Sequence, residues 1–211
     1  MARIKLYGQP GWGSVLTEAQ LVWYEMDYDF ESVGDLFKSS AAQRKIAEIN
    51  PVGQIPALVM ADGTVMTESA AITLHLADIA NSDSLVPAAG SPERAMFLRW
   101  LIFIVANIYP TFTYGDEPSR FVSGREGLES FKKAVDEYAI KMYRVLEDQA
   151  QQPWFLGERF SAIDIFICTM TRWQPGREWF ADNAPKLFSI ATATEEVDSL
   201  KATWQRNFPG E

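Results

Sequence analysis

The sequence has very little of the residue types that build metal, disulfide or redox chemistry. Its 211 residues include one cysteine, Cys168, and one histidine, His75. A single cysteine excludes an intrachain disulfide, a Cys-x-x-Cys redox pair and a cysteine-rich metal site. His75 shares a helical face with Ile72 and Ile79, which favours a packing or interface role over a catalytic one. We therefore expect no metal site.

Basic clusters and long apolar runs are also scarce. The protein has 19 basic and 28 acidic residues and a net charge of −9, which disfavours binding to nucleic acid or anionic membranes. The longest apolar run, Trp100 to Ala106, is far shorter than the ~18 residues of a membrane span. The N-terminus lacks the apolar region of a signal peptide. These features predict a cytoplasmic protein that binds neither membranes nor nucleic acid.

What the sequence does contain is enough apolar material for a substantial core. Hydrophobic residues make up 47% of the sequence and aromatic residues 13%. The length fits a small α/β unit followed by a helical unit. Residues 82–90, rich in Ser, Ala and Asp and including Pro87, are typical of an interdomain linker. We expect a first domain at residues 1–81 and an all-helical second domain at residues 91–211.

The most informative stretch runs from Asn50 to Asp78. Ala57–Met60 is a short apolar run, and Asp62-Gly63 after it predicts a tight hairpin turn, because glycine accepts a positive φ. Val65-Met66 forms the return strand. Thr67-Glu68-Ser69 then opens a helix, since such polar side chains suit the free N–H groups at a helix start. The stretch therefore predicts a loop, a strand, a turn, a strand and a helix.

The position of Pro56 indicates a ligand site. Pro56 begins the first of these strands, where it removes one ladder donor, and X-Pro bonds are the ones that can be cis. The backbone N–H and C=O of Ile55 can then pair with an extended peptide as with an added strand. Glu68 and Ser69, at a helix start, suit the carboxylate and ammonium groups of an α-amino acid. The alternative is a plain hairpin followed by a capped helix.

These residues together resemble the glutathione-binding half of the glutathione S-transferases, and most closely the bacterial, cytosolic, serine-type enzymes. The resemblance implies a thioredoxin-like α/β N-terminal domain followed by an all-α C-terminal domain. It also implies that Ile55, before a cis Pro56, pairs with the cysteinyl part of glutathione. Glu68 and Ser69 would hold the γ-glutamyl end, and Gln54 would lie near the glycine carboxylate.

Ser14 is the candidate residue for activating the glutathione thiol. It begins a helix predicted to end near Tyr24, and both a helix N-terminus and a hydroxyl donor favour a thiolate. Other classes of the resembled family use a tyrosine or a cysteine in this region, where this sequence has Gly8 and Gly13. The alternative is that Ser14 is the N-cap of the helix, and the two roles can coexist.

The second domain is expected to be a helical bundle. Ser91 is predicted to cap a helix that is apolar nearly all round from Ala95 to Ile108, and Pro110 is predicted to kink it. Gly124–Ala150 has apolar residues alternating three and four apart, which predicts one long amphipathic helix. The Ser161–Asp164 segment predicts a capping box with a folding role. In the resembled family, Trp12, Tyr109 and Tyr114 would wall the electrophile pocket.

The resemblance implies a transferase that conjugates the glutathione thiolate to apolar electrophiles, as in detoxification. Glutathione would be the co-substrate, with no metal, and the protein would be a homodimer. Two alternatives remain open. One is a glutathione-binding or ligand-carrying protein without catalysis, and the other is a glutathione-dependent peroxide or disulfide reductase.

Overall fold

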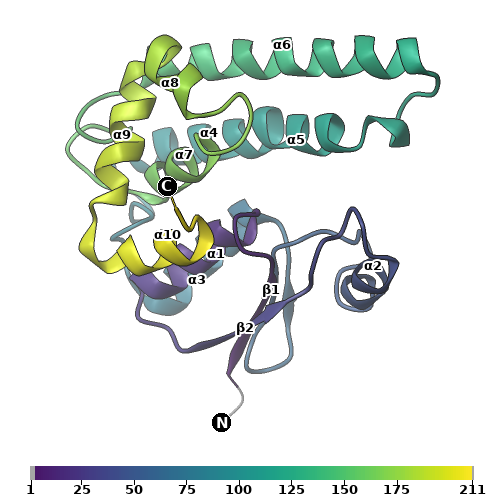
Figure 1. The fold of residues 1–211 in the computed structure, drawn as a ribbon. Coiled ribbons are helices and arrows are strands. Elements are labelled where there is room, and N and C mark those ends of the chain that lie inside the picture. The colour runs from purple at the N-terminus through teal and green to yellow at the C-terminus, as the bar shows by residue number, and fades with distance from the viewer. Residues whose placement is uncertain (1–2, 211) are drawn as a thin grey trace. The chain divides into compact units, whose positions relative to one another are not determined.

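The computed structural model describes residues 3–210 (Figure 1). The protein forms two compact units. One runs to Val86 and also includes the segment from Thr194 onward, and the other is Pro87–Ala193.

The first unit is built on a four-stranded mixed sheet with the strand order β2-β1-β3-β4. β1 pairs parallel with β2 and antiparallel with β3, and β3 pairs antiparallel with β4. Its elements are β1 (Ile4–Gly8), α1 (Ser14–Trp23), β2 (Tyr28–Ser32), α2 (Ser40–Ala47), β3 (Ala57–Val59), β4 (Val65–Met66), α3 (Ser69–Ala80), the 3-10 turn η3 (Asp198–Leu200) and α10 (Lys201–Asn207). This order confirms the predicted thioredoxin-like arrangement.

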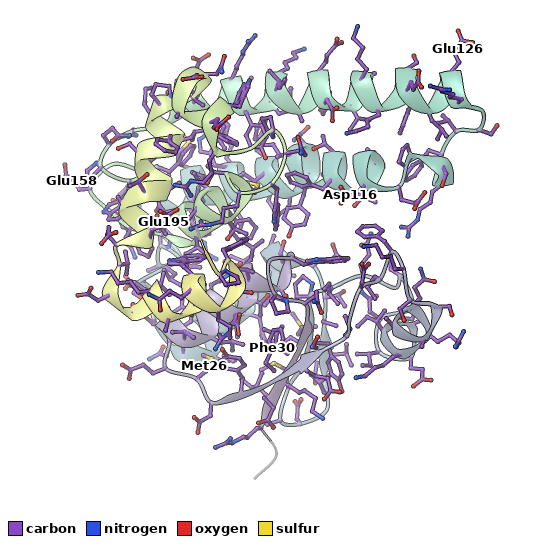
Figure 2. The ribbon with its side chains drawn as sticks, viewed as in Figure 1. Met26, Phe30, Asp116, Glu126, Glu158 and Glu195 are labelled. Carbon is purple, nitrogen blue, oxygen red and sulfur yellow. The ribbon has the colours of Figure 1, made fainter. Side chains whose placement is uncertain are left out.

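Side chains on alternate positions of the strands face two different cores. Leu6 and Leu58 pack with Leu21 of α1 and with Ile72 and Leu76 of α3. Two partly buried side chains that are labelled in Figure 2, Met26 and Phe30, lie against the same cluster. Ala57 instead packs with Val33, Leu36, Ala42 and Ile46, in and around α2. The sheet is therefore covered by α1 and α3 on one face and by α2 on the other.

The second unit is helical. It contains α4 (Arg94–Phe103), the π-helical turn η1 (Ile104–Ile108), α5 (Tyr109–Asp116), the 3-10 turn η2 (Pro118–Arg120), α6 (Arg125–Gln149), α7 (Ala162–Met170), α8 (Arg177–Asn183) and most of α9 (Pro185–Glu195). The predicted long amphipathic helix is α6, a single helix of 25 residues.

Pro110 lies where the sequence predicts a kink, and the helical path widens there into a π-helical turn. η1 connects α4 to α5, and Pro110 occupies the first turn of α5. Proline has no N–H to donate to the preceding turn, and its ring crowds the carbonyl four residues earlier. A π-helical turn relieves such a mismatch without ending the helical path.

The helical path Arg94–Asp116 is long and apolar enough to cross a membrane, with a mean hydropathy of 1.5 over an 18-residue window. This length arises because η1 joins α4 and α5 into one path. Its buried side chains belong to the core of the second unit and include Phe97, Trp100, Leu101, Ile104 and Ile108. Packing inside the second unit accounts for these buried side chains, which are part of the 33% of the window that is buried.

The capping box predicted before α7 is present. The Ser161 backbone N–H donates to Asp164 Oδ2 at 2.7 Å, and the Ser161 hydroxyl donates to the same oxygen at 3.1 Å. Asp164 Oδ1 accepts the backbone N–H of Phe155 at 2.8 Å. Because Ser161 and Asp164 are fully buried, these bonds tie the connector before α7 to the helix itself.

Two expectations differ from the structure. Ser91 does not cap α4, which begins at Arg94 with Glu93 at its cap position and no capping bond from a side chain. The predicted second domain at residues 91–211 also differs at its C-terminal end, because the segment from Thr194 belongs with the first unit. Arg206 and Asn207 of α10 contact Glu18 of α1, and this long-range polar contact has no local sequence signal.

We predict that the stabilising effect of Asp164 depends on pH. Burial raises its pKa to about 7, whereas an unfolded aspartate has a pKa of about 4. The folded state therefore holds an extra proton between these values, so the contribution of Asp164 to the free energy of unfolding declines as the pH rises through 7. Urea unfolding of the wild type and Asp164→Asn at about pH 5 and about pH 8 tests this.

The difference in unfolding free energy between the wild type and Asp164→Asn should be larger at the lower pH. Asp182→Asn, at an exposed position of α8, is the matched control and should leave the unfolding free energy nearly unchanged. A difference that grows toward the higher pH would mean that the ionised carboxylate is the stabilising form.

Candidate functional site

The β3–β4 hairpin leaves the backbone of Ile55 open. The last pair of this hairpin on that side is Leu58 with Met66, three residues beyond Ile55. Within residues 3–210, no group hydrogen-bonds to the Ile55 backbone N–H or C=O. The Ile55–Pro56 peptide bond is cis. An extended ligand can therefore pair with Ile55 without displacing a protein partner.

The same hairpin brings the start of α3 close to Pro56. Leu58 pairs with Met66 and Val59 with Val65, and α3 begins three residues after Met66. The predicted peptide-pairing residue precedes β3 and the predicted amino-acid-binding residues follow β4, so the hairpin places both at the same end of its two strands.

Glu68 and Ser69 have polar groups available for a ligand. Glu68 has a φ of 64°, which is uncommon for a residue with a side chain. Its exposed carboxylate forms no hydrogen bond or ion pair with any residue that the structure describes, and the Ser69 hydroxyl forms none either. α3 is not capped by a side chain, so the N–H groups of its first turn stay open to an anion.

Gln54 is exposed and precedes Ile55 in the loop. Its backbone C=O accepts the side-chain amide of Asn50 at 2.8 Å, while the Asn50 Oδ1 accepts the N–H of Val52 at 3.2 Å. Asn50 is buried and thereby shapes the loop that presents Ile55. The sequence analysis did not assign this role, because a single asparagine in a loop carries no specific signal.

Ser14 is fully buried, and its hydroxyl is already in use. The hydroxyl accepts the Gln9 backbone N–H at 3.0 Å and donates to the Gln9 C=O at 3.0 Å. It lies so close to Gly8 that a Cβ at Gly8 would be 2.4 Å from the Ser14 oxygen. Donation to a thiolate would require the hydroxyl to leave Gln9.

The N-cap interpretation of Ser14 is wrong. α1 begins at Ser14, and Gly13 occupies the cap position in a helical conformation, without a side-chain bond. The side chain of Ser14 instead reaches back across the loop to Gln9. Gly13 already has helical backbone angles, so the residue before α1 lacks the extended conformation that N-cap residues usually have.

The start of α1 presents backbone N–H groups. Trp12, Val15 and Leu16 donate to acceptors in the preceding loop, whereas within residues 3–210 the N–H groups of Gly13 and Ser14 find no acceptor. These two N–H groups, together with the positive end of the helix dipole, favour a negative charge at this point. They are the groups most suited to stabilise a thiolate here.

Gln9 is a further residue that the sequence analysis did not single out. Its side-chain oxygen accepts the Ser32 hydroxyl at 2.8 Å and the Gly34 N–H at 3.2 Å, which ties the loop after β1 to the end of β2. A glutamine in a polar, glycine-rich loop gives no signal of such a contact. Only the parallel pairing of β1 with β2 brings these residues together.

The three predicted pocket aromatics belong to different units. Trp12 lies in the first unit, where its ring contacts that of Phe37 at 5.0 Å. Tyr109 lies in the second unit, where its buried hydroxyl has a raised pKa because of burial, and its ring contacts that of Trp173 at 5.8 Å. Tyr114, also in the second unit, is exposed and contacts Phe121. Their grouping around an electrophile stays a prediction.

Within the part of the protein that the structure describes, no three His, Cys, Asp or Glu side chains gather as metal ligands. Cys168 is buried in α7, and its sulfur accepts from Arg172 Nη1 at 3.2 Å. The chemistry open to the site is therefore that of hydrogen-bond donors, two helix starts and one carboxylate.

Known proteins resemble this chain over nearly its whole length. Residues 18–79 match the family described as glutathione S-transferase, N-terminal domain. The sequence is 38% identical over 205 residues to the uncharacterized GST-like protein YncG of Escherichia coli (strain K12). The aligned region covers 97% of this protein and 98% of YncG. It is also 29% identical over 171 residues to the glutathione S-transferase GstA of Escherichia coli O157:H7. That aligned region covers 81% of this protein and 82% of GstA.

Two solved structures are also similar. A glutathione transferase homologue from Sulfitobacter with bound glutathione has a TM-score of 0.85 and 25% identity, over 96% of this protein and 97% of that one. A sphingomonad glutathione S-transferase complexed with glutathione has a TM-score of 0.78 and 25% identity, over 98% of this protein and 100% of that one.

We predict that Ser14→Ala lowers the free energy of unfolding by about 1–3 kcal/mol, because the Gln9 backbone N–H loses the hydroxyl that accepts its hydrogen bond. Denaturant unfolding measures the difference. Ser40→Ala, at an exposed position that begins α2, is the matched control and should change stability by no more than about 0.5 kcal/mol. Equal stability of the two variants would show that the Ser14 hydroxyl does not support the loop.

Proposed function

Because the chain belongs to the glutathione S-transferase family, we propose that it binds glutathione and conjugates the glutathione thiolate to apolar electrophiles. The observation that carries this proposal is the open backbone of Ile55 beside the uncapped start of α3. A tripeptide with a free amino-acid end matches both features at once.

Glutathione would lie in an extended conformation beside Ile55, at the N-terminal end of β3 and beyond its last pair with β4. The cysteinyl backbone would exchange hydrogen bonds with the N–H and C=O of Ile55, as an added strand does. Its γ-glutamyl carboxylate would meet the N–H groups at the start of α3 and the Ser69 hydroxyl, and its ammonium group would meet Glu68. Gln54, exposed beside Ile55, would contact the glycine end.

The N–H groups of Gly13 and Ser14 would stabilise the thiolate. A free thiol of this type has a pKa of about 8.5, and each unit by which the pKa falls corresponds to roughly 1.4 kcal/mol. Two N–H donors and a helix start can lower the pKa by one or two units. In this proposal the Ser14 hydroxyl acts through Gln9, by holding the loop.

A glutathione-binding protein without catalysis is the second candidate. It is favoured by the position of the Ser14 hydroxyl, which is bonded to Gln9 and not directed at a ligand. The protein also has no cysteine in the site that could form a mixed disulfide with glutathione, since Cys168 is buried in α7. The lack of such a cysteine weakens the disulfide-reductase alternative, which would pass through a mixed disulfide with the protein.

We further propose a cytoplasmic homodimer. Its support is a set of large apolar side chains exposed in the second unit, among them Met96 and Ile102 of α4 and Tyr138 of α6. Tyr138 donates a hydrogen bond to Asn107 at 3.2 Å, so α6 and η1 present their side chains at one place. A second copy of the protein would remove this apolar surface from water.

We predict that Glu68→Ala weakens glutathione binding about 10- to 100-fold, because a charge-assisted hydrogen bond to the ligand ammonium contributes about 1.5–3 kcal/mol. Isothermal titration calorimetry measures the dissociation constant. Glu48→Ala, at an exposed position that ends α2 in the same unit, is the matched control and should bind as the wild type does. Equal affinity of both variants would count against this binding geometry.

Turnover separates a transferase from a carrier. We expect the wild type to conjugate glutathione to chlorodinitrobenzene at a rate well above the uncatalysed reaction, because the bound thiol is ionised at neutral pH. Absorbance of the conjugate measures this rate. Tight glutathione binding without rate enhancement would favour the carrier, and reduction of a hydroperoxide in place of conjugation would favour the reductase.

A further inference from the structure

The carboxylate of Glu18 is buried in the first unit and is surrounded by partners from distant segments. Glu18 lies on α1 and is 1% exposed, so it requires partners that offset its lost hydration. Oε1 pairs with the Arg206 guanidinium and accepts the Tyr28 hydroxyl at 3.0 Å, and Oε2 accepts the Asn207 side-chain amide at 2.7 Å. Two of these three partners come from α10, which is thereby fastened to α1.

Asn207 connects this carboxylate to the loop before α1. Its Oδ1 accepts the Gly11 N–H at 3.1 Å, while its Nδ2 donates to Glu18 and to the C=O of Thr203 at 2.9 Å. An amide turned by 180° would direct its nitrogen at the N–H of Gly11 and its oxygen at the carboxylate of Glu18. The contacts therefore permit one orientation of this buried side chain.

Gly11 is fitted to α10. It has a φ of 78°, which favours glycine, and a Cβ there would lie 3.2 Å from the backbone oxygen of Asn207. The loop and the C-terminal helix thus approach each other too closely for a side chain at this position. Tyr28 completes the arrangement as a donor, because burial and the charge of Glu18 raise its pKa to about 12.

The loop between β1 and α1 is consequently held along its length. Ser14 bonds to Gln9 at one end, and Asn207 bonds to Gly11 in the middle. Gly13 and Ser14 lie two and three residues after Gly11. Their N–H groups find no acceptor within residues 3–210. Without Asn207 the middle of the loop would lose this side-chain anchor from α10.

We propose that Asn207, oriented by Glu18, is a positioning residue for the glutathione thiolate: by holding Gly11 it directs the N–H groups of Gly13 and Ser14 toward the sulfur. This inference rests on the proposed function. The anchors for the rest of glutathione, Ile55 and Glu68, lie beside β3 and α3, outside the hydrogen bonds of Asn207. Loss of Asn207 should therefore affect ionisation of the thiol and turnover more than affinity.

The test compares Asn207→Ala with Asn183→Ala. Asn183, on α8, makes the same kind of bond to the carbonyl four residues earlier and is exposed, so it is a matched control. Thiolate absorbance of bound glutathione against pH gives the thiol pKa, calorimetry gives the dissociation constant, and steady-state kinetics give kcat and KM. For Asn207→Ala we expect the bound-thiol pKa to rise by about one unit, with affinity and KM within about threefold of wild type.

Gly11→Ala perturbs the same contact from the loop side and keeps the proposal testable if Asn207→Ala does not fold. It should raise the bound-thiol pKa in the same way, and the two changes combined should shift it by less than their sum. An unchanged bound-thiol pKa in a folded Asn207→Ala or Gly11→Ala variant overturns the inference and leaves the proposed function standing. A wild type that binds no glutathione overturns the proposed function, and the inference falls with it.

Discussion

Strand pairing between β3 and β4 ends at Leu58 and Met66, and the candidate site depends on that early end. If pairing continued, protein groups would occupy the backbone of Ile55 and a peptide would have no edge to join. Because it stops, the backbone turns into α3 with Glu68 at a positive φ and the first helical N–H groups uncapped. One short hairpin thereby brings together a strand edge, a carboxylate and a helix start.

A second constraint is the burial of polar groups that only distant segments can satisfy. Glu18 is neutralised by α10, and Asn207 of the same helix reaches the loop before α1. The first unit is therefore completed by residues that follow the whole helical unit in the sequence. The linker composition of residues 82–90 suggested that a single cut divides the protein into its two units. The contacts of α10 explain why the first unit instead includes a second, C-terminal segment.

Much of the fold could be predicted because its signals are local. Asp62-Gly63 marks the hairpin turn, Ser161 and Asp164 form their capping box, and Pro110 interrupts a helix for a steric reason that proline carries anywhere. Residues without such signals were predicted less well. The Ser14 hydroxyl was expected at a thiol or at a helix cap; it does not cap α1 and bonds to Gln9, and its role toward a thiol stays a prediction.

The sequence by itself determined the elements and the thioredoxin-like order of the first unit, since periodicity, turn chemistry and proline geometry act over a few positions. Tertiary structure alone decided which hydroxyls and amides remain available to a ligand. A hydrogen-bond donor is available only when no partner reaches it, and partners such as Asn207 for Gly11 come from 196 residues away. Hydrogen bonding at that separation depends on packing, which no local pattern records.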